Sequence, residues 1–151
     1  MLLLFIVASE AIGSIGSFAT IPAIPTWYQF LTKPPFNPPN WIFGPVWTLL
    51  FACMGISAYL VWQESLTKKS VKNALTWFGI QFVFNVLWSF LFFKAQSPIA
   101  GLVCIGILWV LIICTIQLFM KVNKKAGFLL IPYLLWVSFA TYLNAGIMLL
   151  N

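Results

Sequence analysis

The feature that most constrains the fold is a succession of five apolar runs, each about as long as the roughly 20 residues that an α-helix needs to cross a membrane. They cover approximately residues 2–21, 41–62, 74–93, 98–120 and 126–150. The chain is 62% hydrophobic and 7% charged, whereas soluble domains are about 45–50% apolar and about 25% charged. The period-two alternation of a membrane β-barrel is absent. The sequence therefore predicts an all-α, polytopic membrane protein built as a bundle of five transmembrane helices.

The five runs and their connections use the whole chain, so we predict a single membrane domain over residues 1–151. The first run contains Glu10, has no basic segment in front of it and is not followed by a small-residue cleavage site. A cleaved signal peptide would show the opposite features. We therefore expect the first run to be a retained span.

The placement of the lysines predicts the orientation in the membrane. Six of them follow the second and fourth runs: Lys68, Lys69, Lys72, Lys121, Lys124 and Lys125. Only Lys33 and Lys94 follow the first and third runs. Because basic residues concentrate in cytoplasmic loops, we expect a cell-membrane protein with a cytoplasmic N-terminus and an extracytoplasmic C-terminus. Topology and anionic lipid headgroups account for the net charge of +6, so we expect no nucleic-acid partner.

The connection between the first two runs, residues 22–40, is rich in proline and aromatic residues. Pro34, Pro35, Pro38 and Pro39 exclude a continuous helix, because each lacks an N–H and pushes the residue before it out of the helical region. The orientation above places this segment on the extracytoplasmic side. We interpret it as an ordered loop at the membrane surface that covers something buried.

The side chains exclude most catalytic chemistry. The chain has no histidine, its only carboxylates are those of Glu10 and Glu64, and its three cysteines all lie inside apolar runs. A metal centre needs several converging nitrogen, sulfur or carboxylate ligands, and hydrolysis needs a base, so we expect neither a metal site nor conventional acid–base catalysis. Eight tryptophans and a few amides remain.

These tryptophans and amides recur with helical periodicity on three of the runs. One face of each run carries the following sets: Trp47, Phe51, Met54, Ala58 and Trp62; Gln81, Phe84, Asn85, Trp88 and Phe92; and Trp136, Ala140 and Leu143, with Tyr133 and Asn144 at the margin. An unpaired amide in hydrocarbon costs several kcal/mol, so these faces should point into the bundle. Periodicity alone leaves open whether they bind a ligand or only pack helices. Trp41, Trp62 and Trp77 lie near run ends and are typical of interfacial residues.

Glu10 lies in the middle of the first run, among small residues. Ser9, Gly13 and Ser17 form a face that lets another helix come close. A carboxylate at this depth should be neutral, paired or near water, so both a packing role and a functional role remain open for Glu10.

Three sequence blocks closely resemble the signature of the TspO/MBR family, which includes tryptophan-rich sensory proteins and the translocator protein. The first is Trp27-Tyr-x-x-Leu-x-Lys-Pro-x-Phe-x-Pro-Pro-x-Trp-x-Phe-Gly-Pro-Val-Trp47. The others are Gln81-Phe-Val-Phe-Asn85-Val-Leu-Trp88-Ser89 and Pro132-Tyr-Leu-Leu-Trp136-Val-Ser-Phe-Ala140-Thr-Tyr-Leu-Asn144. The resemblance covers essentially the whole chain.

This resemblance implies a five-helix bundle, commonly a homodimer, with a cavity for porphyrins and, in some members, benzodiazepine-type drugs or sterols. Carried over by position, the ligand-binding residues are Tyr28, Pro38, Trp47, Phe51, Asn85, Trp88, Trp136, Ala140 and Asn144. Some bacterial members are thought to degrade protoporphyrin with light and oxygen, and the tryptophans implied there are matched by Trp47 and Trp136. No resident cofactor is implied.

The last run departs from the sterol-binding members, because residues 143–151 contain no tyrosine and no basic residue. Cholesterol recognition by that route is therefore not expected. The chain also lacks histidine, so a metal-free protoporphyrin suits the predicted cavity better than haem does. Three functions stay open: a sensory or transport protein that binds a tetrapyrrole unchanged, an enzyme that consumes it, and a membrane scaffold without ligand chemistry.

Overall fold

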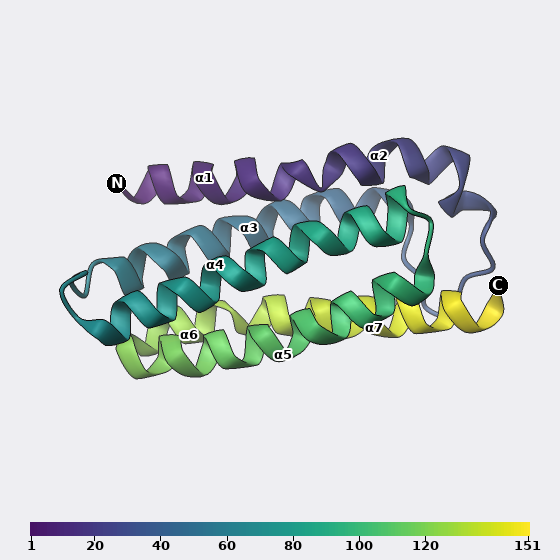
Figure 1. Cartoon of the computed structure of the whole chain (residues 1–151). Coiled ribbons are helices and arrows are strands. Elements are labelled where there is room, and N and C mark those ends of the chain that lie inside the picture. The colour runs from purple at the N-terminus through teal and green to yellow at the C-terminus, as the bar shows by residue number, and fades with distance from the viewer.

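Outside its short connections, the chain is helical throughout residues 1–151 of the computed structural model (Figure 1). The elements in order are α1 (Leu2–Ile15), α2 (Ser17–Thr26), the short 3₁₀ turn η1 (Tyr28–Phe30), α3 (Asn40–Trp62), α4 (Lys69–Ser89), the π-helical turn η2 (Phe90–Lys94), α5 (Pro98–Val122), α6 (Lys124–Leu129) and α7 (Ile131–Leu150). Four segments are long and apolar enough to cross a membrane, and α1 with α2 makes a fifth when the bent pair is counted as one span. The predicted five-helix membrane bundle is confirmed.

The predicted ends agree closely with the structure for two of the five spans and differ for the others. The second and fourth spans differ from α3 and α5 by at most two residues. The third begins five residues earlier than predicted, at Lys69, and ends in η2. The fifth is interrupted at Leu130, two residues before Pro132, which has no N–H to continue the hydrogen bonding of α6.

The first span is bent by 41° where α1 meets α2. The bend falls at Gly16, within a stretch of glycine and serine residues, at which helices often kink. The predicted end of this span at residue 21 is wrong, because the helix continues through Pro22 and Pro25 to Thr26. The Thr26 hydroxyl donates to the carbonyl of Pro22 at 2.7 Å, in the last turn of this helix.

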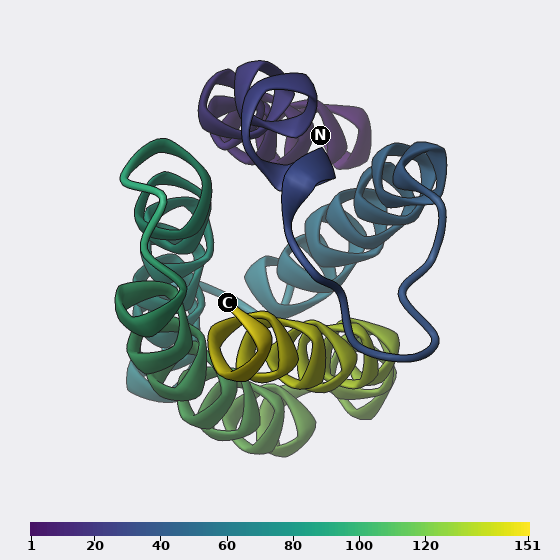
Figure 2. The same cartoon turned by 90° about the vertical axis from the view of Figure 1, so that its right-hand side faces the viewer.

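The remaining connection, residues 31–39, is an ordered loop that packs against the C-terminal end of α7. Tyr142 Oη donates to the carbonyl of Pro35 at 3.0 Å. The side chain of Asn151 pairs with both backbone groups of Thr32, each at 2.9 Å. Gly146 faces Pro34 so closely that a Cβ on this glycine would lie 2.6 Å from the proline ring. In the end-on view the loop runs past the C-terminus before it joins α3 (Figure 2).

The helices pack side by side as a bundle (Figure 2). α1 and α2 lie on one side of the bundle and α5 and α7 on the other, with α3 and α4 between them (Figure 2). The main core joins α3, α4, α5, α6 and α7 around residues such as Met54, Phe119 and Tyr133. α1 approaches α3 at Gly55, where a Cβ would lie 2.7 Å from the Cα of Ile6. The two helices diverge beyond this contact, toward α2.

Both lysine-rich connections lie at the end of the bundle that carries the N-terminus, whereas residues 31–39 and the C-terminus lie at the other end (Figure 1). Asn123 Nδ2 donates to Glu64 Oε1 at 3.3 Å and links the two lysine-rich connections. The bundle therefore has one basic end and one aromatic, proline-rich end.

Candidate functional site

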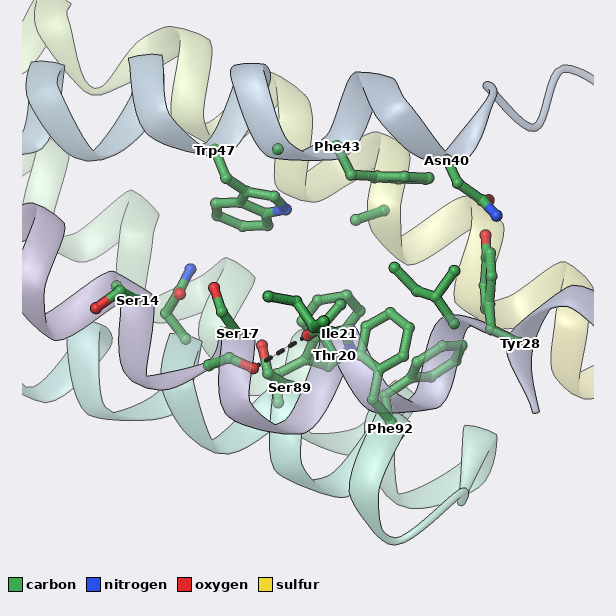
Figure 3. Close-up of a pocket in the computed structure, with 18 of the residues that line it drawn as sticks. Ser14, Ser17, Thr20, Ile21, Tyr28, Asn40, Phe43, Trp47, Ser89 and Phe92 are labelled. Carbon is green, nitrogen blue, oxygen red and sulfur yellow. Dashed lines mark hydrogen bonds between the residues drawn. The ribbon is translucent and has the colours of Figure 1, made fainter. Parts of the chain in front are cut away.

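A cavity of about 400 Å³ lies where α1 and α2 diverge from the rest of the bundle. This volume is within the range of about 300–1,000 Å³ that is usual for small-molecule sites. Residues of α1, α2, η1, α3, α4, η2 and α7 line it, whereas α5 and α6 contribute none. Figure 3 shows Trp47 and Phe43 extending from α3 toward Thr20 and Ile21 of α2.

Aromatic rings form most of the cavity wall. On α3, Phe43, Trp47 and Phe51 follow one another at intervals of one helical turn, and the rings of Trp47 and Phe51 stack with centroids 5.4 Å apart. Opposite them, Trp88 stacks on Phe92 at 5.6 Å. These walls present flat apolar surfaces, which suit the face of a flat aromatic ligand.

Trp136 brings the third aromatic wall from α7. Its ring contacts Phe43 edge to face, with centroids 5.9 Å apart. Its Nε1 is enclosed and has no hydrogen-bond partner. An indole N–H without a partner is unusual in a protein interior.

Two buried amides line the cavity, and one of them is Asn85, with 4% of its surface exposed. Asn85 Nδ2 donates to Tyr133 Oη at 2.9 Å, and Tyr133 Oη donates to Gln81 Oε1 at 2.8 Å. Asn85 Oδ1 accepts no bond from within the chain and, unlike Gln81 Nε2, is not fully enclosed. In this arrangement Asn85 presents its amide oxygen to the cavity.

Asn144 also lines the cavity, but both atoms of its amide are used within the chain. Its Oδ1 accepts from Trp88 Nε1 at 3.1 Å, and its Nδ2 donates to the carbonyl of Pro98 at 2.7 Å. Asn144 thereby ties α4 and the start of α5 to α7. Its role in the structure is to hold Trp88 in place.

One side of the cavity is polar and lined with small residues. Ser14, Ser17 and Thr20 come from α1 and α2, and Ser89 comes from α4 (Figure 3). Glu10 lies in the same lining and is only partly buried. Gly13 is in contact with the ring of Phe51, so a Cβ at this position would overlap the ring. Glycine here leaves room for both the ring and the cavity.

Eight of the nine ligand-binding residues predicted from the sequence lie in this lining: Tyr28, Trp47, Phe51, Asn85, Trp88, Trp136, Ala140 and Asn144. Pro38 does not. Its loop is held against the end of α7 by the contacts of Tyr142 and Asn151, so no residue from 31 to 39 reaches the cavity. Pro38 therefore lies outside the cavity lining, whereas residues of α2 and Tyr28 belong to it.

Tyr28 lies in η1 at the aromatic end and is 4% exposed. Its hydroxyl donates to Asn37 Oδ1 at 3.1 Å, and Lys33 Nζ lies 4.9 Å from its ring centroid. Burial raises the pKa of this hydroxyl above its ordinary value. Tyr28 is therefore a neutral, already bonded group that contributes its ring to the cavity.

Sequence reasoning missed several lining residues. The missed set includes Ser14, Ser17, Thr20, Ile21, Ile24, Asn40, Phe43, Gly44, Thr48, Ser89, Phe93 and Ile147. Phe43 could have been found, because it lies one turn before Trp47 on the same face. The residues of α2 had no such signal.

Two of the tryptophans expected at the membrane interface differ in their surroundings. Trp41 is 73% exposed and lies at the rim of the cavity. Trp62 packs against Phe5 and lies outside the lining.

The side chains of the chain form no group of three or more His, Cys, Asp or Glu residues that could hold a metal ion. The cysteines Cys53, Cys104 and Cys114 are free thiols. The groups available in the cavity are therefore aromatic rings, including indoles with their redox chemistry, together with a few hydroxyls and amides and the carboxyl group of Glu10.

Comparison with known proteins gives a consistent result. Residues 5–150 match the TspO/MBR family. The sequence is 47% identical to the tryptophan-rich protein TspO of Archaeoglobus fulgidus over 146 residues, which is 97% of this chain and 94% of that protein. It is 46% identical to the protein of the same name from Chlorobaculum tepidum, over 93% of this chain and 89% of that protein. Identity to the human translocator protein is 38% over 78% of this chain and 70% of that protein.

Proposed function

Because the chain belongs to the TspO/MBR family of multi-pass membrane proteins, we propose that its cavity binds a flat, apolar ligand of the tetrapyrrole class, with metal-free protoporphyrin as the first candidate. The observation that carries this proposal is the cavity of about 400 Å³ whose walls are the rings of Trp47, Trp88 and Trp136 and their aromatic neighbours. Packing between helices alone does not account for such a cavity, because protein interiors are normally filled.

Stacking accounts for the affinity we expect. Each favourable aromatic pair adds about 0.5–1.5 kcal/mol beyond the burial of its area, and the cavity offers rings on three sides. Haem iron usually takes an axial His, Met, Cys or Tyr. The chain has no histidine, and the one tyrosine in the lining, Tyr28, is already bonded to Asn37. The metal-free ring therefore fits the lining better than haem does, and no resident cofactor is needed.

A sensory or transport role would use this binding without changing the ligand. The rim supports an exchange path, because Ile21 on α2 and Trp41 on α3 border the cavity and are 67% and 73% exposed. A ligand could thus enter from the bilayer. Benzodiazepine-type drugs belong to the same class of flat apolar ligands, whereas cholesterol does not match the sequence of α7.

A second function, light- and oxygen-dependent degradation of the porphyrin, is favoured by the placement of Trp47 and Trp136. Both indoles line the cavity, one on α3 and one on α7. In this reaction the porphyrin is oxidised. The light-excited ring passes its energy to molecular oxygen, which is the oxidant and adds its two atoms across a carbon–carbon bond of the macrocycle that then breaks, while neighbouring indoles relay electrons from the ring to oxygen. The role of catalytic residues would then fall to these two tryptophans.

Absorption spectroscopy of the purified protein in mild detergent tests both functions. Binding shifts the Soret band of added protoporphyrin and quenches tryptophan fluorescence, and degradation adds a progressive loss of absorbance under light. Ala140→Phe fills the cavity and should abolish the shift. Gly106→Phe is the matched control, because Gly106 lies on α5 away from the cavity and a Cβ there meets nothing within 4 Å. A wild-type protein that leaves the spectrum unchanged would indicate a scaffold without ligand chemistry.

We further propose that the basic end of the bundle lies in the cytoplasm, which places the N-terminus inside the cell and the C-terminus outside. The proposed membrane is the cell membrane, and the proposed assembly is a homodimer.

A further inference from the structure

Three buried side chains form a hydrogen-bonded row that leads from the core to the cavity. Gln81 is 1% exposed, Tyr133 is 1% exposed and Asn85 is 4% exposed. Only Asn85 lines the cavity. We propose that Gln81, Tyr133 and Asn85 form a reversible hydrogen-bond relay that sets whether the cavity offers its ligand an amide oxygen or an amide N–H.

The direction of donation along the row can reverse, because each amide carries both a donor and an acceptor and a hydroxyl can do both. In one direction Asn85 Nδ2 donates to Tyr133 Oη, which donates to Gln81 Oε1. A half-turn of each amide exchanges its oxygen and nitrogen without changing its shape. Gln81 Nε2 then donates to Tyr133 Oη, which donates to Asn85 Oδ1, so both hydrogen bonds are kept.

The direction decides what faces the ligand. In the first direction the free atom of Asn85 is its Oδ1, which accepts a hydrogen bond. In the reversed direction the free atom is Nδ2, which donates one. Since Tyr133 has a single hydroxyl proton, it cannot donate to both amides at once. The polarity of Asn85 is therefore coupled to that of Gln81, which does not touch the cavity.

The buried end of the row favours the reversed direction. In the first direction Gln81 Nε2 is fully enclosed and has no partner, so both of its N–H groups are unsatisfied. In the reversed direction one of these N–H groups is bonded and the carbonyl of Gln81 is left without a partner. Unsatisfied buried N–H groups are rarer in proteins than unsatisfied carbonyls, which indicates that they cost more.

A ligand with a hydrogen-bond acceptor at Asn85 is therefore preferred, because it pairs with Nδ2 in the reversed direction. This inference rests on the proposed function only in that the cavity takes a flat ligand, and it adds the chemistry of the ligand edge: a ring nitrogen, carbonyl or carboxylate oxygen at Asn85. It makes Gln81 and Tyr133 positioning residues that determine specificity through Asn85.

Two tricyclic probes of similar size test the relay. Acridine carries a ring nitrogen that only accepts a hydrogen bond, and carbazole carries a ring N–H that only donates one. Their affinities for the full-length protein in detergent can be measured by fluorescence titration at mildly alkaline pH, where both are neutral. We expect the wild type to bind acridine more tightly than carbazole.

Gln81→Met should increase this preference by about threefold to tenfold, the range of one hydrogen bond, because Tyr133 then has only Asn85 to donate to. In the Tyr133→Phe background the same substitution should leave the acridine-to-carbazole ratio unchanged, since the coupling is gone. Thr115→Val is the matched control: Thr115 is 1% exposed, bonds only within α5 and does not line the cavity.

The outcomes separate the two proposals. If both probes bind and Gln81→Met leaves their ratio unchanged, or changes it equally with and without the Tyr133 hydroxyl, the relay is overturned while the proposed function stands. If Thr115→Val moves the ratio as much as Gln81→Met does, the effect is general packing and the relay is again overturned. If neither probe binds the wild type or any variant, the proposal that the cavity binds a flat ligand is contradicted, and the relay is overturned with it.

Discussion

The indole Nε1 of Trp88 donates a 3.1 Å hydrogen bond to Oδ1 of Asn144, across the gap between α4 and α7. The same amide donates to the carbonyl of Pro98 at 2.7 Å. One side chain thus fixes a cavity tryptophan and the start of α5. These two bonds account for an amide in an apolar span without any need for a ligand. Asn144 therefore supports the wall of the site.

Asn144→Leu should destabilise the protein and disturb Trp88. The substitution leaves the N–H of Trp88 without a partner and removes the side-chain bond to the carbonyl of Pro98. An unpaired buried group costs about 1–3 kcal/mol. Thermal unfolding in detergent measures the loss. Thr141→Val, one turn earlier on α7, removes only a bond within the helix and should change stability much less. Equal melting temperatures for the two variants would contradict the supporting role of Asn144.

Gly55→Ala should weaken the contact between α1 and α3. The added Cβ would lie 2.7 Å from the backbone of Ile6 and Phe5, and backbone cannot move aside as a side chain can. Overpacking of this kind costs about 1–3 kcal/mol. Gly79→Ala is the control, because a Cβ there meets nothing within 4 Å and alanine is the better helix former by about 1 kcal/mol. The prediction fails if Gly55→Ala melts at or above the wild-type temperature.

Trp47→Phe and Trp136→Phe should separate binding from photochemistry. Phenylalanine keeps much of the stacking surface, so protoporphyrin affinity should fall by less than about tenfold, a loss of 1.4 kcal/mol. Phenylalanine exchanges electrons poorly, so light-driven loss of porphyrin should slow sharply. Trp77→Phe, outside the cavity lining, should bleach porphyrin like the wild type. Equal bleaching rates in all four proteins at saturating ligand would leave a binding protein without the degrading activity.

Single cysteines introduced at Lys33 and Lys69 should report the orientation of the bundle. These positions lie at opposite ends of the molecule (Figure 1), and the free thiols Cys53, Cys104 and Cys114 must first be replaced. A membrane-impermeant thiol reagent added to intact cells should label position 33 and leave position 69 unlabelled. The reverse pattern would place the aromatic end in the cytoplasm.

Local sequence properties were enough to predict the spans and three walls of the cavity. Span length depends on hydrophobicity along the chain, so α3 and α5 were located to within two residues. Helical periodicity placed Trp47, Asn85 and Trp136 on inward faces, and all three line the cavity. These properties are readable because each belongs to a single helix.

The rest of the site depends on how the helices are placed against one another. α2 lines the cavity with Ser17, Thr20 and Ile21, yet its sequence carries no polar or aromatic stripe that would reveal it. Pro38 lies outside the cavity lining because its loop packs against α7. The partner of Asn85 is Tyr133, a residue 48 positions away along the chain. A sequence pattern fixes which face a side chain takes on its own helix, but its neighbours depend on the distances and rotations between helices, and long-range packing alone decides those.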